Sequence, residues 1–331
     1  MNKTIVLEKR PFGKPALSDF KLINEELPAL HVGEVLLKTL YVSVDPYLRG
    51  RMNDVKSYVP PFELGKPIKS GIIARVTASN LAEFKVDDIV SGLLDWKEYQ
   101  VSNGLGLIKV DPEIASLTAY LGILGMTGLT AYLGLTKIGD PQPGETLVVS
   151  GAAGAVGSIA GQIGKILGCK VVGIAGTDEK VNELKSSFKF DDAINYKTTP
   201  DLKAAVAAAC PNGVDIYFDN VGGEISDAVL ANINEHARIA LCGAISLYNE
   251  TKQPLGPRVQ PIMITKSATM SGFIISDFAE KFPTAINILA SWLKEGKLTY
   301  TETIVEGFDN IPKAFLDLFE GKNNGKMIVK I

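Results

Sequence analysis

Side chains that bind metals or act as nucleophiles are scarce in this chain, which has three cysteines and two histidines among 331 residues. They are Cys169, Cys210, Cys242, His31 and His236. No two of them stand at the C-x-x-C or H-x-x-x-H spacing of zinc sites, so we expect no metal site. Cys169 precedes an apolar run and Cys242 lies within one, so both are interpreted as small buried hydrophobic residues. So few thiols also indicate a reducing compartment.

Long apolar runs and blocks of one charge are missing as well. The N-terminus, MNKTIVLEKRPFGKP, has no signal-peptide core, and no run reaches the length of a membrane span. The net charge is −3 and no Lys/Arg block stands out, which argues against a nucleic-acid surface. Apolar residues make up 46% of the chain, enough for one large or two ordinary domains. We therefore expect a cytoplasmic protein that binds neither nucleic acid nor membrane.

The first part of the chain is predicted to be rich in β-strands. The strand-like segments are short and are separated by Gly, Asn, Asp and Pro, a pattern typical of a barrel or sandwich. They are Val35–Val44, Gly71–Thr77, Asp88–Gly92, Trp96–Val101 and Leu107–Val110. The segment Ser43–Met52 interrupts this pattern with an Asp-Pro turn signal and with one tyrosine and two arginines.

After Leu117–Gly134, an apolar stretch predicted to form one or two helices, strands and helices alternate. The predicted strands are Thr146–Ser150, Lys170–Ala175, Ala193–Tyr196, Val214–Asn220, Arg238–Cys242 and Thr269–Ile275. The predicted helices are Val156–Leu167, Glu179–Phe188, Asp201–Ala209, Glu224–Asn234 and Phe278–Gly296. Six strands joined by helical crossovers predict an α/β Rossmann domain with a parallel, doubly wound sheet. Gly243–Lys266 has no clear element, and so long a connection is more often functional than idle.

The tail, Thr299–Ile331, is predicted to form a strand, a helix and a strand. Because two such strands do not readily extend a sheet covered by helices, we expect the tail to return to the N-terminal β domain. The predicted domains are residues 1–122 for the β domain, 123–297 for the nucleotide-binding domain, and 298–331 for the return of the chain.

A glycine-rich turn joins the first strand of the α/β region to its helix, in TLVVSGAAGAVGSIAGQIGKILG. Gly154 and Gly157 would let the backbone approach a pyrophosphate, and the N–H groups at the helix start would face the phosphates. Ala152 stands where the first glycine of G-x-G-x-x-G is expected. The motif predicts a dinucleotide site, and a tight strand–helix turn without a ligand is the alternative.

The end of the second strand bears on which dinucleotide is bound. Gly176 leaves room for a 2′-phosphate, and Lys180 could pair with it. Asp178 is the only nearby acid for a ribose 2′-hydroxyl, and it could equally cap the next helix. This pattern favours NADP over NAD, with an ordinary solvated lysine as the alternative reading.

Loops after the fourth and fifth strands, Asp219–Gly223 and Cys242–Ser246, lie at the carboxyl edge of the predicted sheet. We expect them to line the ribose and nicotinamide, although ordinary turn chemistry would explain them too.

General acids and bases are few. His31 and His236 lie in predicted turns away from the ligand edge, and no G-x-S-x-G nucleophile motif occurs. The chemistry is therefore expected to come from the cofactor as hydride transfer. Tyr47 and Tyr248 are the best-placed hydrogen-bond donors for developing charge, and a packing or surface role is the alternative for each.

Several motifs taken together resemble the zinc-free medium-chain reductases. They are VDPYLRGRM, KIGDPQPGETLVVSGAAGAVGS, DNVGG, CGAIS-x-YN and GK-x-IVKI, and they are similar to those of the 2-alkenal, prostaglandin and curcumin reductases. The resemblance covers nearly the whole chain. It implies a GroES-like β domain and a Rossmann domain, a homodimer, and NADPH-dependent reduction of the α,β double bond of enals and enones.

The resemblance also implies a set of cofactor-binding residues. They are Ala152, Ala153, Gly154, Ala155, Val156, Lys180, Tyr196, Asn220, Cys242, Gly243, Ala244, Ile245, Ser246, Tyr248, Phe273, Ile274, Ile275 and Asn323. One position departs from the family pattern, because Thr265 stands where prostaglandin reductases carry a tyrosine on the substrate side. The shorter side chain argues against prostaglandin-like substrates.

Three functions are thus considered. In the first, hydride passes to the β-carbon of an enal or enone, and a hydroxyl of Tyr47, Tyr248 or the cofactor ribose holds the enolate. The second is an NADPH:quinone oxidoreductase on the same scaffold. The third is a protein that binds NADPH without catalysis, because a fold and a nucleotide site do not prove turnover.

Overall fold

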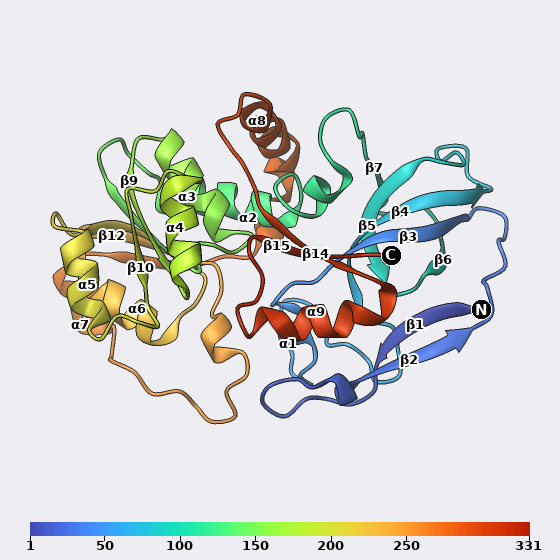
Figure 1. The fold of residues 1–331 in the computed structure, drawn as a ribbon, viewed down its shortest axis with the longest axis horizontal. Coiled ribbons are helices and arrows are strands. Elements are labelled where there is room, and N and C mark those ends of the chain that lie inside the picture. Colours follow the sequence, from blue (N-terminus) through green and yellow to red (C-terminus); the bar gives the residue numbers. More distant parts are fainter. The chain divides into compact units, whose positions relative to one another are not determined.

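The computed structural model describes the whole chain, Met1–Ile331, as two compact units (Figure 1). We call the first the β unit; it comprises Met1–Leu121, Glu302–Asn323 and Met327–Ile331. The second, the α/β unit, comprises Gly122–Thr301 and Asn324–Lys326. Each unit is therefore built from segments that lie far apart in the sequence.

A six-stranded parallel sheet forms the centre of the α/β unit, and its order is β10-β9-β8-β11-β12-β13. The strands are β8 (Thr146–Ser150), β9 (Lys170–Ala175), β10 (Asp192–Asn195), β11 (Val214–Asp219), β12 (Ile233–Leu241) and β13 (Thr269–Gly272). The order reverses between β8 and β11, as in a doubly wound sheet. The predicted Rossmann sheet is confirmed.

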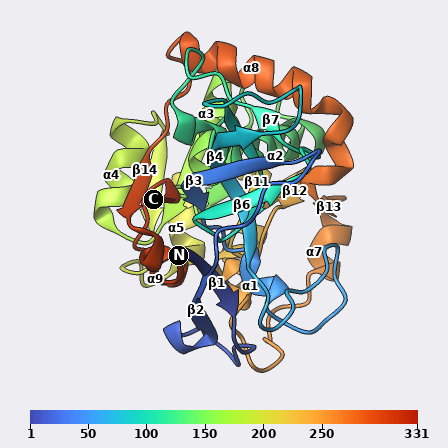
Figure 2. The ribbon, with the colours of Figure 1, turned by 90° about the vertical axis from the view of Figure 1, so that its right-hand side faces the viewer.

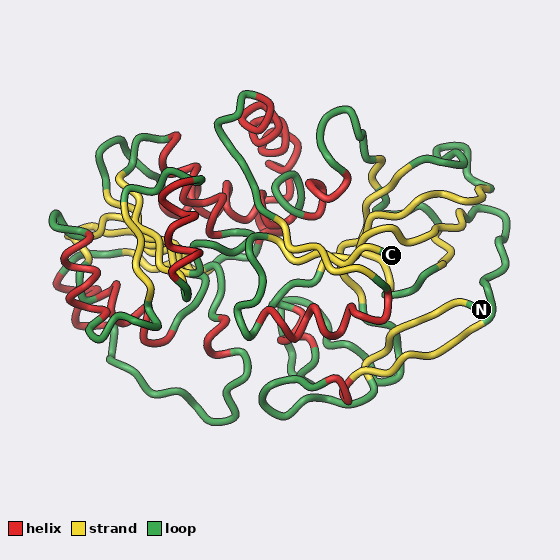
Figure 3. Tube along the Cα trace, viewed as in Figure 1, coloured by secondary structure: helices red, strands yellow, loops and turns green.

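Helices connect these strands and lie on both sides of the sheet (Figure 3). The crossovers are α3 (Gly157–Ile166), α4 (Asp178–Ser186), α5 (Leu202–Ala209) and α6 (Gly223–Leu230). The unit also contains α2 (Met126–Gly134), a π-helical turn η3 (Leu135–Gly139), α7 (Gln260–Thr265), and α8 (Phe282–Lys294) after the 3₁₀ segment η5 (Ile275–Lys281). Side-chain caps start two of the crossovers, because Thr177 accepts from Lys180 N and Asp201 from Ala204 N.

The β unit holds a seven-stranded sheet with the order β14-β15-β3-β4-β5-β7, and β6 pairs with β3. Its strands are β3 (Val35–Ser43), β4 (Lys69–Ser79), β5 (Ile89–Asp95), β6 (Tyr99–Ser102), β7 (Ile108–Lys109), β14 (Glu302–Glu306) and β15 (Lys326–Lys330). A separate antiparallel pair is made by β1 (Asn2–Leu7) and β2 (Phe20–Glu25). The helices α1 (Leu48–Arg51) and α9 (Ile311–Leu318), with the 3₁₀ segments η1 (Leu17–Asp19), η2 (Leu117–Leu121) and η6 (Phe308–Asn310), complete this unit (Figure 2).

The tail packs into the core of the β unit. Phe315 of α9 is fully buried and meets the ring of Phe20 edge-on, with 6.1 Å between the ring centroids. Phe20 also stacks on the buried Trp96 at 6.4 Å. In α9 the apolar residues recur with helical spacing, so Ile311, Phe315 and Leu318 face this core together.

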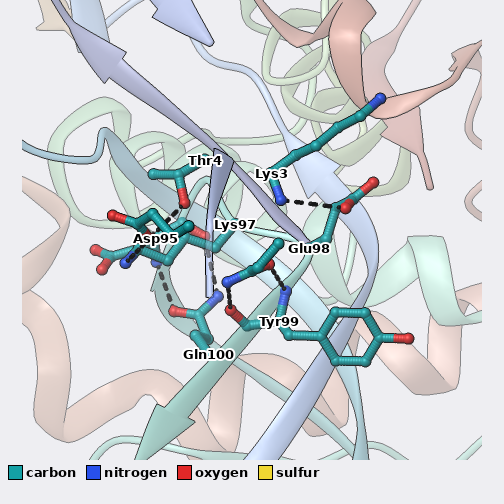
Figure 4. A network of polar contacts seen from close by, with 9 residues as sticks. Lys3, Thr4, Asp95, Lys97, Glu98, Tyr99 and Gln100 are labelled. Atoms are coloured by element: carbon teal, nitrogen blue, oxygen red, sulfur yellow. Dashed lines mark hydrogen bonds and ion pairs between the residues drawn. The ribbon is translucent and has the colours of Figure 1, made fainter. Parts of the chain in front are cut away.

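The pair β1–β2 was missed in the sequence, and polar contacts explain how β1 is held (Figure 4). Asn2 exchanges two hydrogen bonds with the backbone of Tyr99, at 2.8 and 2.9 Å, and Lys3 N donates to the Glu98 carboxylate. Lys97 and Thr4 both contact Glu25. These partners lie more than twenty residues apart along the chain, so no local sequence pattern indicates the contacts.

Two further predictions were wrong in part. The helix expected over Glu224–Asn234 ends at Leu230, because β12 already begins at Ile233. The strand bulges before Arg238, where His236 has φ of 61° and donates its N–H to Lys266 O at 2.7 Å. The stretch Gly243–Lys266, expected to lack elements, contains the 3₁₀ turn η4 (Ile245–Leu247) and helix α7. None of the helices combines the length and the apolar character needed to cross a bilayer.

Candidate functional site

The glycine-rich turn lies between β8 and α3, at the carboxyl edge of the parallel sheet. Gly151 takes the left-handed conformation, with φ of 57°, and its carbonyl accepts the N–H of Gly154 at 2.9 Å. The glycine that opens the turn is therefore Gly151, one residue before the Ala152 position considered in the sequence. Ala152 instead is buried and donates its N–H to Ile174 O of β9.

Close packing explains the last glycine of the turn. A Cβ on Gly157 would lie 2.3 Å from Gly151 O, so no side chain fits between the turn and the start of α3. Gly154 is less restricted, with 3.1 Å to the same oxygen. Because the first N–H groups of a helix have no intrahelical acceptor, those at the start of α3, near Ala155 and Val156, can bind an anion.

The end of the chain contacts this turn. Gly325 N donates to Ala153 O at 2.9 Å, and Gly325 forms an isolated parallel bridge with Gly154. Glu183 of α4 accepts hydrogen bonds from the hydroxyl of Thr301 and the amide of Asn324. Asn323, the preceding residue, belongs to the β unit. The C-terminal segment thus supports the turn through backbone atoms, which the sequence did not indicate.

The ends of β9 and β10 form a corner that contains Gly176, Lys180 and Tyr196. A Cβ on Gly176 would lie 3.1 Å from the Tyr196 ring and 3.3 Å from Lys197 Cε, so glycine keeps this corner open. Asp178 accepts a hydrogen bond from Asn195 Nδ2 at 2.7 Å, while Thr177 caps α4. Asp178 therefore does not act as the cap that the sequence allowed.

Two lysines share this corner, although only Lys180 was predicted. Burial lowers the pKa of Lys180, the positive charge of Lys197 lowers it further, and Glu183 partly opposes both effects. Two neighbouring ammonium groups next to a glycine, which has no side chain to fill the space, suit a dianionic group such as a phosphate monoester. A basic residue directly after a predicted strand was the only signal for Lys197.

The loop after β11 is tied to the end of β8. Asn220 donates its backbone N–H to Ser150 Oγ at 2.9 Å and its side-chain amide to Ser150 O at 2.8 Å. Asp219 is 1% exposed, and its side chain accepts a hydrogen bond from the Ser150 hydroxyl at 2.8 Å. Ser150 and Asp219 lie on the two strands where the sheet order reverses, which is where ligands of doubly wound sheets bind.

The loop after β12 lies against the same segment. Cys242 N and Gly243 N both donate to Asp219 O, and Ser246 Oγ donates to Val221 O at 2.7 Å. Ala244 N donates to the hydroxyl of Tyr248 at 3.4 Å, so this tyrosine lies over its own loop. Burial raises the pKa of the Cys242 thiol to about 12, which leaves it protonated and poorly nucleophilic.

Phe273 directly follows β13, and its ring packs among other aromatic side chains. The ring packs against Phe218 and Phe278, with centroids 6.4 and 6.2 Å away. A Cβ on Gly134 of α2 would lie 2.3 Å from the same ring. Ile274 N donates to Asp277 at the start of η5, whose first residue is Ile275.

Tyr47 lies in the β unit, immediately before α1. Its side chain is half-buried against the core of that unit. Burial and the nearby Asp45 carboxylate raise the pKa of its phenol well above the usual range, and Arg51 only partly opposes them. The hydroxyl therefore keeps its proton at neutral pH and is available as a hydrogen-bond donor.

Comparisons with known proteins agree along the whole chain. A family model described as "N-terminal domain of oxidoreductase" matches residues 3–110, and one described as "Zinc-binding dehydrogenase" matches residues 155–291. A putative NADP-dependent oxidoreductase of Bacillus subtilis, YfmJ, is 56% identical over 99% of this chain and 97% of its own length. The chain belongs to the medium-chain dehydrogenase/reductase family.

Within the family, the chain is similar to one branch in particular. Prostaglandin reductase 1 of Bos taurus is 46% identical over 99% of this chain and 98% of its own length, and the branch also holds NADPH-dependent curcumin reductase and 2-alkenal reductase. The crystal structure of CurA from Vibrio vulnificus in complex with NADPH has a TM-score of 0.94 and 44% identity, over 99% of this chain and 98% of that one. The resemblance read from the motifs is confirmed.

One family description concerns zinc, and the side chains of this medium-chain reductase bear on it. The structure has no group of three or more His, Cys, Asp or Glu residues that could hold a metal ion. Cys169 and Cys210 are buried, and burial raises the pKa of each thiol to about 11. His31 lies exposed in a turn, and His236 lies in the bulge of β12.

Proposed function

We propose that this protein is an NADPH-dependent reductase of the α,β carbon–carbon double bond of enals and enones. The observation that carries the proposal is the arrangement at the carboxyl edge of the sheet, where the glycine turn and the corner of Gly176, Lys180 and Tyr196 suit a dinucleotide with a 2′-phosphate. The full-length similarity to the curcumin, 2-alkenal and prostaglandin reductases supports the reaction class.

The residues present fit NADPH in three places. The turn Gly151–Gly157 and the start of α3 would take the pyrophosphate, and the lysine corner the 2′-phosphate. The loops around Asn220, Cys242–Tyr248 and Phe273–Ile275 would take the nicotinamide half, and Asn323 would complete the set. When bound, NADPH supplies a hydride for the β-carbon of the substrate.

The protein would assist by binding the oxygen on which negative charge develops. Tyr47 suits this role because its hydroxyl stays protonated, and a neutral donor lowers the energy of an enolate without transferring its proton first. Tyr248 is the second donor, since its hydroxyl lies at the cofactor loop beside Ala244 N. Solvent would then protonate the α-carbon. Neither step uses a metal ion, so we propose that the reaction is independent of zinc.

Substrate choice is proposed to favour small or flat enals and enones over prostaglandins. Thr265 is the last residue of α7, and its hydroxyl donates to Ile262 O of its own helix at 3.2 Å. A hydroxyl engaged in this way does not replace the longer tyrosine that prostaglandin reductases carry at this position. The homodimer and the cytoplasmic location stay predictions from the sequence.

The test is a substrate panel with purified protein, in which the loss of reduced nicotinamide absorbance is followed. The panel holds trans-2-nonenal, a simple enone, curcumin, 15-oxo-prostaglandin and an ortho-quinone, with NADPH and NADH in parallel. We expect the enal and the enone to be turned over, at a much higher rate with NADPH than with NADH. Product analysis is expected to show the saturated carbonyl compound. Activity with added chelator is expected to be unchanged.

Other outcomes would replace the proposal. Turnover of the quinone alone would assign an NADPH:quinone oxidoreductase. Tight NADPH binding with no turnover of any acceptor would assign a cofactor-binding protein without catalysis. Loss of activity with a chelator, restored by zinc, would contradict the zinc-independent mechanism.

A further inference from the structure

The carboxylate of Asp219 is buried beneath the carboxyl edge of the parallel sheet. It stands at the end of β11, beside the point where the strand order reverses, and is 1% exposed. Its Oδ1 accepts four hydrogen bonds: from Ser150 Oγ and the Tyr217 hydroxyl, both at 2.8 Å, and from the backbone N–H groups of Val221 and Gly222, both at 2.9 Å. One oxygen of this carboxyl group thus gathers donors from two side chains and two backbone groups.

The same residue also fixes the loop after β12 through its backbone. Asp219 O accepts the N–H groups of Cys242 at 2.9 Å and Gly243 at 3.0 Å. Side chain and backbone of one residue thus join the ends of β8, β11 and β12. A buried carboxylate needs such partners, because each unpaired buried group would carry a desolvation cost.

Further hydrogen bonds extend this arrangement to the loops that face the ligand edge. Ser150 Oγ, which donates to Asp219, accepts the N–H of Asn220. Asn220 O accepts Ile245 N at 3.3 Å, and Val221 O accepts Ser246 N at 3.1 Å. The corner of Gly176, Lys180 and Tyr196 lies instead at the ends of β9 and β10, on the other side of the reversal.

We propose that Asp219 is a positioning residue for the nicotinamide half of the cofactor, acting through Ser150, Asn220 and the Cys242–Ser246 loop. The inference rests on the proposed function, since it takes NADPH as the ligand. Asp219 touches no reacting atom. It fixes the positions of the backbone and amide groups that would contact the nicotinamide ribose, and it has no effect on the residues that would bind the adenosine half.

Two ligands separate this role from a general effect on stability. NADPH occupies both halves of the site, whereas adenosine 2′,5′-bisphosphate reaches only the adenosine side. Dissociation constants of both are measured by isothermal titration calorimetry for the wild type and for Asp219→Ala, Asp219→Asn and Ser150→Ala.

We expect Asp219→Ala to weaken NADPH binding by about tenfold to a hundredfold, because it removes the acceptor of several buried donors. Binding of adenosine 2′,5′-bisphosphate is expected to stay within about twofold of the wild type, because Asp219 makes no contact with the corner that binds it. Asp219→Asn keeps an acceptor oxygen in place and should restore most of the NADPH affinity. Ser150→Ala removes one partner without removing the carboxylate, so it should give a smaller loss in the same direction even if Asp219→Ala does not fold.

A matched control comes from Asp19 of the β unit, another buried aspartate, whose carboxylate accepts the N–H of Ala16 at 2.7 Å. Asp19→Asn should leave the ratio of the two dissociation constants unchanged. The positioning role would be overturned if Asp219→Ala and Ser150→Ala lost affinity for both ligands to the same extent, or if neither lost affinity for NADPH. A wild type that binds both ligands but reduces no enal or enone would overturn the substrate proposal alone, and one that binds no NADPH would overturn both.

Discussion

Tyr47 and Tyr248 differ in their surroundings, although the proposed mechanism gives their hydroxyls the same task. Tyr47 is half-buried, and this burial together with the nearby Asp45 carboxylate raises the pKa of its phenol, so the phenol stays protonated. Tyr248 instead lies over its own loop, where its hydroxyl accepts a hydrogen bond from Ala244 N. A donor that acts on an enolate is used fully only in the transition state. Its removal should therefore lower kcat more than it raises KM.

Replacement by phenylalanine tests these roles. We expect Tyr47→Phe or Tyr248→Phe to lower kcat for an enal on the order of tenfold to a thousandfold, with the KM for NADPH little changed. Tyr99→Phe is the control, because Tyr99 makes its hydrogen bonds to Asn2 through its backbone. Unchanged kcat in both test variants would remove the tyrosines from the mechanism.

Lys180 provides a prediction on pH. Its pKa is lowered by burial and by Lys197, so its ammonium group loses the proton at a lower pH than an exposed lysine does. The kcat/KM for NADPH should therefore fall as the pH rises through this lowered pKa, while that for NADH stays level. Both are measured between neutral and alkaline pH.

Two variants identify the group responsible. Lys180→Ala should weaken NADPH binding by about tenfold to a hundredfold, because the charged hydrogen bond is lost. It should also remove the fall in kcat/KM for NADPH at alkaline pH. Lys180→Arg keeps its charge over this range and should keep NADPH preferred throughout. An alkaline fall that persists in Lys180→Arg would assign the titration to another group.

Among the elements, those with a strong local pattern were predicted well. The strands β8 and β9 begin and end where the β-branched runs of the sequence do, and the helices after them follow from apolar residues at helical spacing. Elements stabilised by distant partners were missed. The pair β1–β2 depends on polar contacts with residues 97–99, and α7 is a six-residue helix with a proline near its start, too short to show a period.

The candidate site followed the same rule. Motifs that are contiguous in the sequence, such as the glycine turn and the loop at Asn220, could be placed at the ligand edge. Lys197 was not selected, and Asp219 was named only as the first residue of the loop Asp219–Gly223, because the importance of both depends on contacts between strands that are not neighbours in sequence. The support that Gly325 gives to the turn arises from the last residues of the chain meeting its middle.

Gly325 gives a test at the level of elements. Its φ is 63°, and an added Cβ would lie 1.8 Å from Thr301 O, so Gly325→Ala requires the backbone itself to move. We expect a cost of about 3 kcal/mol or more, seen as a marked fall in the melting temperature, together with weaker NADPH binding.

Gly307 is the matched control. Its φ of 94° is also unfavourable for alanine, but the nearest atom to an added Cβ is Asn310 Nδ2 at 3.5 Å. Gly307→Ala should cost only about 1–2 kcal/mol of backbone strain and leave NADPH binding unchanged. Equal effects of the two variants would mean that strain alone, and not the contact with Thr301, makes Gly325 necessary.

For the whole molecule, ligand binding should be visible in thermal unfolding. NADPH at about a hundred times its dissociation constant should stabilise the folded protein by about 2.7 kcal/mol and raise the melting temperature by a few degrees. NADH at the same concentration should give a much smaller rise, because it lacks the 2′-phosphate that the lysine corner suits. Equal shifts would contradict the NADP preference.

The bond from Gly325 N to Ala153 O also sets the order in which this protein can mature. The ribosome makes the turn Gly151–Gly157 well before its partner, because Gly325 comes much later in the sequence. The turn therefore stays incomplete until Gly325 has been synthesised, and the earlier part of the chain has to remain competent to fold until then.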